Sequence, residues 1–187
     1  MVRKTTKELL TDSFIELAQH KPVNKITVAD ITSNCGVTPP TFYRYFRDKY
    51  DLIAWIYVRE AQKFLGQVGV NGYTWRNTLR DGMRYFAENR QFALNALKHT
   101  SGRDSFIEQK TRLDLGFIIG IIRKRLMTET IPDELLVTVK LYLYGTEHYL
   151  CEWLVDDMPL PWEKVAALME ACVPEALRPY LFEDMAL

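Results

Sequence analysis

The stretch "GVTPPTFYRYFRDKYDL", residues Gly36 to Leu52, gathers prolines, aromatic side chains and basic side chains into a short part of the chain. A helix that only closes a hydrophobic core has no need of Tyr43, Arg44 and Tyr45 in consecutive positions, since successive helical residues point in different directions. The segment is therefore predicted to meet something outside the core, and the organisation of its neighbours indicates what that is.

Two short helices are predicted around this stretch. Thr27 stands three residues before Asp30, which is the spacing of a capping box at a helix start, and Gly36 can end that helix by adopting a left-handed backbone. Thr38 can cap the next helix, which begins with two prolines, where the missing N–H groups cost no intrahelical hydrogen bond. This helix is predicted to end near Phe46.

The third predicted helix has an inward and an outward side. At 100° per residue Phe42 and Phe46 share one side, so Tyr43 and Arg44 must project from the other. A short helix, a turn with glycine and a second short helix form a helix-turn-helix reader of DNA. An outward guanidinium can bond guanine in the major groove, and hydroxyl and ammonium groups can bond phosphates.

Eleven residues are predicted to contact DNA. The first two form a basic N-terminal arm for the minor groove, and Lys49 is expected to reach a phosphate at the start of a fourth helix. The alternative is that the aromatic residues belong to the core and the basic residues to a solvated rim. That alternative suits any single residue, but it does not suit the set. The predicted contacts are Arg3, Lys4, Thr27, Thr38, Pro39, Pro40, Thr41, Tyr43, Arg44, Tyr45 and Lys49.

The segment "ITVADITSNCGVTPPTFYRYFRDKYDLI" resembles the N-terminal domain of TetR-type transcriptional regulators, whose pattern is G-V-[ST]-x-x-T-[FL]-Y-x-[YH]-F-x-x-K-x-x-L. The resemblance covers about residues 5 to 60, and it departs from the pattern at Pro40, where most members have Gly, and at Tyr50, where most have Glu. It implies a homodimer joined by a four-helix bundle, with an effector cavity in the C-terminal half. That half, with "YLYGTEHYLCEWLVDDMP", loosely resembles a subgroup that includes the activator of dihydroxyacetone kinase operons, whose effector is a protein. The effector is therefore left open between a small molecule and a protein.

Helical periodicity continues along the rest of the chain, and neither strand alternation nor an internal repeat is evident, so the fold class is all-α. The glycine-rich "GQVGVNGYT", residues 66 to 74, is predicted to be a loop. Residues 1–50 are assigned to a DNA-binding domain of three helices in helix-turn-helix form, and residues 51–187 to a helical effector and dimerisation domain. The predicted helices are Lys4–Gln19, a short helix after the cap Thr27 that Gly36 ends, a helix from Pro39 to near Phe46, a helix that Asp48 caps and that runs to about Leu65, segments around Trp75–Phe86 and Phe92–Leu97, Phe106–Leu126, Asp133 to about Val155, a helix from "MPLPWE" to Val173 and a short tail helix after Pro174.

The C-terminal half offers large side chains with a few polar tips, which is the composition of ligand cavities. Each of these residues could instead serve the core of the domain. Two apolar series, Leu143/Leu150/Leu154 and Val165/Leu168/Met169/Cys172, are predicted to form the dimer bundle, and Gly116 with Gly120 would permit close packing of another helix. The predicted ligand contacts are Trp75, Met83, Phe86, Phe117, Tyr144 and His148.

Charge and composition limit the function classes. The net charge is zero, but residues 1–49 carry eight Lys or Arg against five acids, which suits a polyanion near the N-terminal end. The N-terminus lacks an apolar secretion segment, so we expect a cytoplasmic protein with no membrane partner. The three cysteines match no metal or disulfide spacing, and no catalytic constellation is found, so no enzyme activity, metal or cofactor is expected.

The sequence thus predicts a DNA-binding regulator, a repressor of the TetR type, that binds a palindromic operator as a homodimer and responds to an effector in its C-terminal domain. The alternative is a coregulator or activator whose C-terminal domain docks a metabolic protein. Thermal shift with metabolite panels, set against capture of a protein from lysate, distinguishes the two. The operator sequence, the regulated genes and the sign of regulation are not encoded in any pattern we find.

Overall fold

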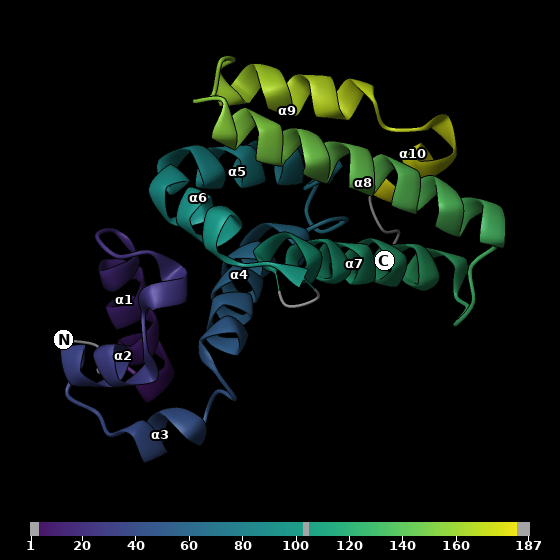
Figure 1. The fold of residues 1–187 in the computed structure, drawn as a ribbon. Coiled ribbons are helices and arrows are strands. Elements are labelled where there is room, and N and C mark those ends of the chain that lie inside the picture. Colours follow the sequence, from purple (N-terminus) through teal and green to yellow (C-terminus); the bar gives the residue numbers. More distant parts are fainter. Residues whose placement is uncertain (1–3, 103–104, 183–187) are drawn as a thin grey trace. The chain divides into compact units, whose positions relative to one another are not determined.

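The computed structural model describes residues 4–102 and 105–182, and the regular structure in these residues is helical apart from an isolated bridge between Val70 and Tyr73. The all-α prediction is therefore confirmed (Figure 1). The elements are α1 (Thr6–Ala18), η1 (Val23–Lys25), α2 (Val28–Asn34), α3 (Pro39–Tyr43), α4 (Lys49–Leu65), α5 (Trp75–Glu88), α6 (Arg90–His99), α7 (Phe106–Leu126), α8 (Asp133–Val155), α9 (Trp162–Ala171), η3 (Glu175–Leu177) and α10 (Arg178–Leu181).

The helices form two compact units. The first contains residues 1–57 and 91–109, and the second contains residues 58–90 and 110–187. In the first unit α2 packs against both α1 and α3. Its core holds Phe14, Ile31 and Phe42, all fully buried, and Phe46 meets Trp55 edge to face with ring centroids 5.9 Å apart.

Helix α6 belongs to the first unit, which differs from the predicted boundary after residue 50. The reason is a buried asparagine whose side chain makes three hydrogen bonds to the end of α1 and the following turn. Asn95 accepts from the N–H of Val23 at 2.9 Å, and it donates to the carbonyls of Ala18 and Lys21 at 2.6 and 2.9 Å. Phe92 on the same helix meets Phe14 edge to face.

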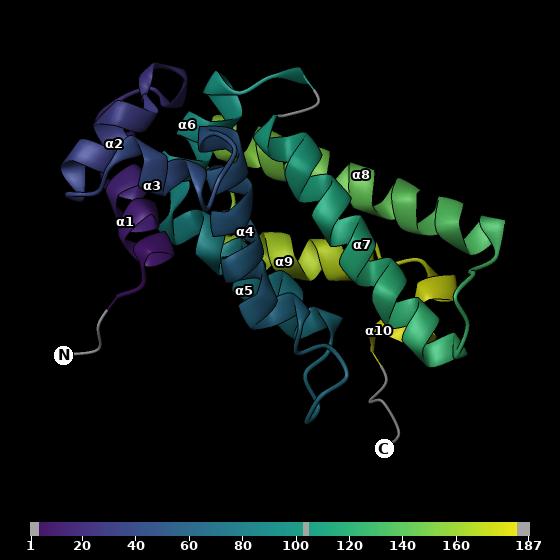
Figure 2. The same cartoon turned by 90° about the horizontal axis from the view of Figure 1, so that it is seen from below.

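The second unit is built on α5, α7, α8 and α9. Figures 1 and 2 show α7 and α8 side by side as a helical hairpin, and α5 packs against α9. Trp75 of α5 donates its indole N–H to the hydroxyl of Tyr142 on α8, and that hydroxyl donates to the carbonyl of Met169 on α9, both at 3.1 Å. This chain of hydrogen bonds ties three helices together through the core.

Several predicted helix ends agree with the structure, but the side chain of Thr38 makes no capping hydrogen bond at the start of α3. The capping box of Thr27 and Asp30 is formed, Gly36 has φ of 70°, and α7 and α8 have the predicted bounds. Helix α3 is shorter than predicted, since it ends at Tyr43 rather than near Phe46. The N–H of Phe46 still bonds the carbonyl of Phe42, but the next N–H, that of Arg47, turns to the carboxylate of Asp51 in α4. The turn η1 was not predicted.

Candidate nucleic-acid interface and ligand groove

Helix α3 presents the two sides that its sequence predicts. Phe42 and Phe46 are 0% and 3% exposed, whereas Tyr43 is 60% exposed and Tyr45 is 37% exposed. Arg44 lies between the two tyrosines and is also exposed. The polar tips of these side chains are therefore available to a partner outside the first unit.

The start of α3 offers side chains rather than backbone donors. Thr38, Pro39 and Pro40 are exposed, and the two prolines carry no N–H, so the positive end of this helix lacks two of its usual donors. The hydroxyls of Thr38 and Thr41 lie 3.0 Å apart and bond each other. Hydroxyls and proline rings are thus the groups that this end of the helix can bring to a groove.

The start of α2 flanks this surface. Thr27 is exposed, and its hydroxyl accepts from the N–H of Asp30 at 3.1 Å. The ammonium of Lys21, followed by the N–H of Thr27, lowers the pKa of Asp30 to about 2. Because Lys21 pairs with this carboxylate at 2.7 Å, the negative charge beside the surface is compensated.

The N-terminal arm is only partly described. Arg3 lies outside the described residues. Lys4 is exposed and pairs with Asp12 at 2.6 Å, so its charge is turned toward α1.

Lys49 does not point outward as the phosphate prediction assumed. Its ammonium donates to the carbonyls of Val23, Asn24 and Ile26 at 2.8 to 2.9 Å, which uses all three of its protons. Burial, followed by repulsion from Lys21, lowers the pKa of Lys49. The side chain therefore holds the turn η1 against the start of α4, and a phosphate contact would require these bonds to be given up.

The six predicted ligand residues are not gathered in one place. Trp75, Met83 and Phe86 are buried in the core of the second unit. Tyr144 is 51% exposed, and the side chain of His148 is 80% exposed beside Glu152. Phe117 lines an open groove.

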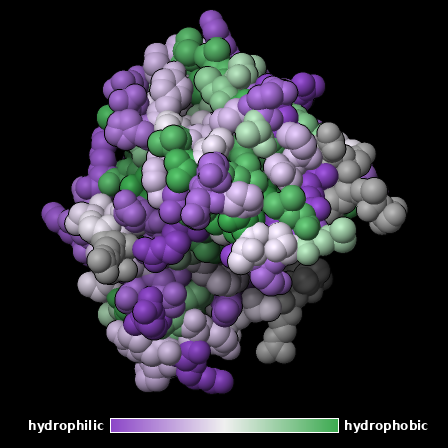
Figure 3. Space-filling model, turned by 90° about the vertical axis from the view of Figure 1, so that its right-hand side faces the viewer, coloured by the Kyte–Doolittle hydropathy of each residue, from purple (hydrophilic) through white to green (hydrophobic). Residues whose placement is uncertain are grey.

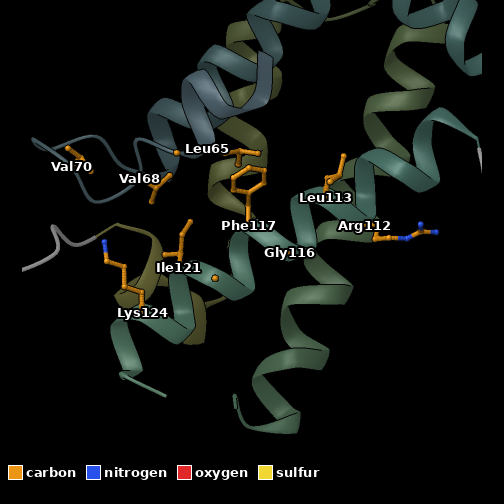
Figure 4. A pocket seen from close by; sticks show the side chains of 11 residues that line it. Leu65, Val68, Val70, Arg112, Leu113, Gly116, Phe117, Ile121 and Lys124 are labelled. Atoms are coloured by element: carbon orange, nitrogen blue, oxygen red, sulfur yellow. The ribbon is translucent and has the colours of Figure 1, made fainter. Parts of the chain in front are cut away.

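That groove has a volume of about 520 Å³ and lies within the second unit. One wall comes from the end of α4 and the turn after it, and the other comes from one face of α7. Figure 4 shows Leu65 and Phe117 close together, with Arg112 and Lys124 toward opposite ends. Most of these residues were not predicted, although the glycine pair on α7 was a signal in the sequence. The lining residues are Leu65, Gly66, Val68, Val70, Arg112, Leu113, Gly116, Phe117, Gly120, Ile121 and Lys124.

A buried charge cluster joins α7 to α8. The ammonium of Lys110 bonds Asp114 at 2.7 Å and the carboxylate of Glu147 at 2.6 Å, and all three side chains are buried. Burial raises the pKa of Glu147 to about 7. The negative charge of Asp114 adds to this rise in pKa, whereas the positive charge of Lys110 opposes it. Burial opposes the charge of Lys110, but the two carboxylates together raise the pKa of Lys110. Sequence analysis did not find this cluster.

The apolar residues expected in the dimer bundle on α8 lie instead in the core of the unit, since Leu143, Leu150 and Leu154 are at most 4% exposed. The exposed face of α8 is the neighbouring stripe. It carries Val137, Leu141, Tyr144 and Val155, at 51 to 71% exposure. On α9, Leu168 is 47% exposed while Val165 and Met169 are buried. Figure 3, which faces the end of α7 and the start of α8, shows hydrophobic surface in patches between hydrophilic side chains.

Residues 4–102 and 105–182 contain no group of three or more His, Cys, Asp or Glu side chains placed to hold a metal ion. In the same residues, none of the helices combines the length and apolar character needed to cross a membrane.

Comparison with known proteins gives matches along most of the chain. Residues 10–56 match the family model described as bacterial regulatory proteins, tetR family, and residues 73–174 match the model described as transcriptional regulator C-terminal region. A curated relative, the HTH-type dhaKLM operon transcriptional activator DhaS of Lactococcus lactis subsp. lactis (strain IL1403), is 29% identical over 87 residues. This match spans 46% of each chain, so it covers less than half of the relative's length.

Solved structures share the fold. The dihydroxyacetone kinase operon activator DhaS superposes with a TM-score of 0.65 at 19% identity, over 94% of this chain and 98% of that one. A TetR transcriptional regulator from Rhodococcus sp. RHA1 gives a TM-score of 0.64 at 16% identity over the same shares.

Proposed function

Since the chain belongs to the tetR family of bacterial regulatory proteins, and is thus a DNA-binding transcriptional regulator rather than an enzyme, we propose that it binds a palindromic operator as a homodimer under the control of an effector. The observation that carries this proposal is the division of α3, in which Phe42 and Phe46 are buried while Tyr43 and Arg44 are exposed. Arg44 reads a guanine. Phosphates or base edges are met by four hydroxyls, those of Tyr43, Tyr45, Thr38 and Thr41. The rings of Pro39 and Pro40 can touch a thymine methyl. The protein acts in the cytoplasm, where the DNA is.

Selection from random duplexes tests this function. Fragments retained by the purified protein are sequenced and the recovered site is measured by fluorescence anisotropy. We expect an inverted repeat whose half-sites lie about one helical turn, 34 to 36 Å, apart. Retention without any enriched sequence would contradict specific operator recognition.

Dimerisation is supported by the exposed stripe of α8 together with Leu168 on α9. Large apolar side chains with about half or more of their surface exposed at helical spacing favour burial against a second copy. A dimer also places two copies of α3 on successive half-sites, which a monomer cannot do. Sedimentation of the purified chain tests this part of the proposal by giving its mass in solution.

A second candidate function is transcriptional activation through a protein effector. The relative from Lactococcus lactis is named an activator, which favours this candidate over the repressor that we predicted. A reporter gene placed behind the selected operator distinguishes them, because expression falls when a repressor is present and rises when an activator is present. Thermal shift with metabolite panels and capture from lysate then separate a small-molecule effector from a protein effector.

A further inference from the structure

Among the residues that the structure describes, the groove between the end of α4 and α7 is open and has the features of a binding site. Its volume of about 520 Å³ lies within the range of small-molecule pockets, roughly 300 to 1,000 Å³. Its walls are formed mainly by apolar side chains, among them Leu65, Val68, Phe117 and Ile121. Such a surface favours an apolar group that it can remove from water.

Two glycines leave the α7 wall of the groove without side chains at two positions. A Cβ atom placed on Gly116 or on Gly120 would meet nothing within 4 Å in the described residues, so neither glycine is needed for packing there. Glycine inside a helix costs about 1 kcal/mol relative to alanine. The open space above both residues therefore has no explanation within the described part of the chain, and an occupant from outside explains it.

The dimensions favour a slender occupant. From Arg112 to Lys124 helix α7 rises about 18 Å, at about 1.5 Å per residue. An extended hydrocarbon chain can lie lengthwise in a groove of this length and volume.

The charges at the groove favour an anionic group at one end of the bound hydrocarbon chain. Of the described residues that line the groove, two are cations, Arg112 and Lys124, and none is a carboxylate. Among the described residues neither cation makes an ion pair or a side-chain hydrogen bond. In Figure 4 the Lys124 side chain rises beside Ile121 at one end of the groove, while Arg112 extends away at the other. An anionic group emerging beside Lys124 would gain a charge-assisted hydrogen bond.

From these observations we propose that the groove binds a single-chain amphiphile, with its hydrocarbon chain along Gly116 and Gly120 and its anionic headgroup at Lys124. The inference deepens the proposed effector control and rests on it only for the effect on DNA binding. A carboxylate and a phosphate headgroup share the required chemistry, and the experiment distinguishes them.

Calorimetric titration of the full chain tests the site without DNA. The probes are dodecanoate and dodecyl phosphate, each below its micelle concentration, with dodecanol and butyrate as controls for charge and chain length. We expect at least one anionic dodecyl probe to bind, butyrate not to bind, and dodecanol to bind at least tenfold more weakly. If neither anionic probe binds the folded chain, the proposal is wrong.

Variants locate the site. Gly120→Leu fills the groove and raises helix propensity, so we expect the fold to persist and probe affinity to fall at least tenfold. Lys124→Ala should weaken the anionic probes about tenfold and leave dodecanol unchanged, whereas Arg123→Ala, which removes the adjacent charge outside the lining, should change neither. Undiminished probe binding by Gly120→Leu would place the ligand elsewhere and overturn the proposal.

The DNA readout separates this inference from the proposed function. Anisotropy of the selected operator is measured with and without the anionic probe. A probe that binds in the groove but leaves operator affinity unchanged supports the ligand site and contradicts effector control through it. A chain that binds the probe but selects no operator supports the ligand site and contradicts the operator proposal.

Discussion

At the scale of single residues, the position of Arg44 depends on its neighbours rather than on its own contacts. Burial of Phe42 and Phe46 fixes the rotation of the α3 turn, and this rotation directs Arg44 and Tyr43 outward. The side chain that we propose reads bases is thus oriented by two buried aromatic side chains.

Replacing Arg44 with alanine should cost about 1 to 3 kcal/mol of binding free energy on the selected operator and relax the preference at one base pair, because a bidentate bond to guanine is lost. Arg47→Ala is the matched control, since Arg47 is exposed but follows the helix. Fluorescence anisotropy on the operator and on single-base variants measures both. Equal affinities for the wild type and Arg44→Ala would remove base reading from this residue.

Replacing Lys49 with methionine should lower the free energy of unfolding by about 1 to 3 kcal/mol, because two half-buried carbonyls and an exposed one lose their donor. Urea denaturation measures this loss. Since the ammonium is engaged within the protein, the dependence of DNA affinity on salt should keep its slope. A slope reduced by about one with unchanged stability would instead identify a phosphate contact.

The buried carboxylate Glu147 should make stability depend on pH. Its pKa of about 7 lies above the value of roughly 4.3 in an unfolded chain. The folded state therefore binds more protons between these values, and the stability that this group contributes is lost as the pH rises toward and through 7. Glu147→Gln removes this component, so the wild type should lose stability relative to the variant between pH 5 and pH 8. Urea midpoints that run parallel in the two proteins across this range would contradict the assignment.

At the scale of elements, α6 shows what the sequence could and could not predict. Periodicity and end signals suffice for α7 and α8, whose bounds were predicted correctly. The unit to which α6 belongs was not predictable, because it depends on hydrogen bonds from Asn95 to residues more than seventy positions earlier. For the same reason periodicity identified the apolar residues of α8 but not which of them face outward.

Replacing Asn95 with leucine should destabilise the first unit by about 2 to 4 kcal/mol, because one N–H and two carbonyls then lack partners in a largely buried place. Hydrogen exchange should rise first in α1 and the turn η1. Gln91→Leu, an exposed position on the same helix, is the control and should leave the unfolding free energy within about 0.5 kcal/mol. Unchanged exchange in Asn95→Leu would show that these hydrogen bonds do not hold α6 in the first unit.

At the scale of the whole molecule, the exposed stripe of α8 governs assembly in our proposal. Leu141 is 71% exposed and lies within this stripe. Leu141→Glu should give a monomer by sedimentation and lower operator affinity at least tenfold, because a buried charge without a partner opposes association. Glu134→Lys, an exposed position near the start of the same helix, is the control. A dimeric Leu141→Glu protein would place the interface elsewhere.

The tryptophans are divided unequally between the two units. Trp55 lies beside Phe46 under α3, whereas Trp75, Trp153 and Trp162 belong to the second unit. A protein that retains only the indole of Trp55 would carry a single fluorescent reporter of the first unit, and a Trp55→Phe protein would report the second unit alone. Their emission recorded during the same denaturant titration would reveal whether the two units unfold together or one after the other.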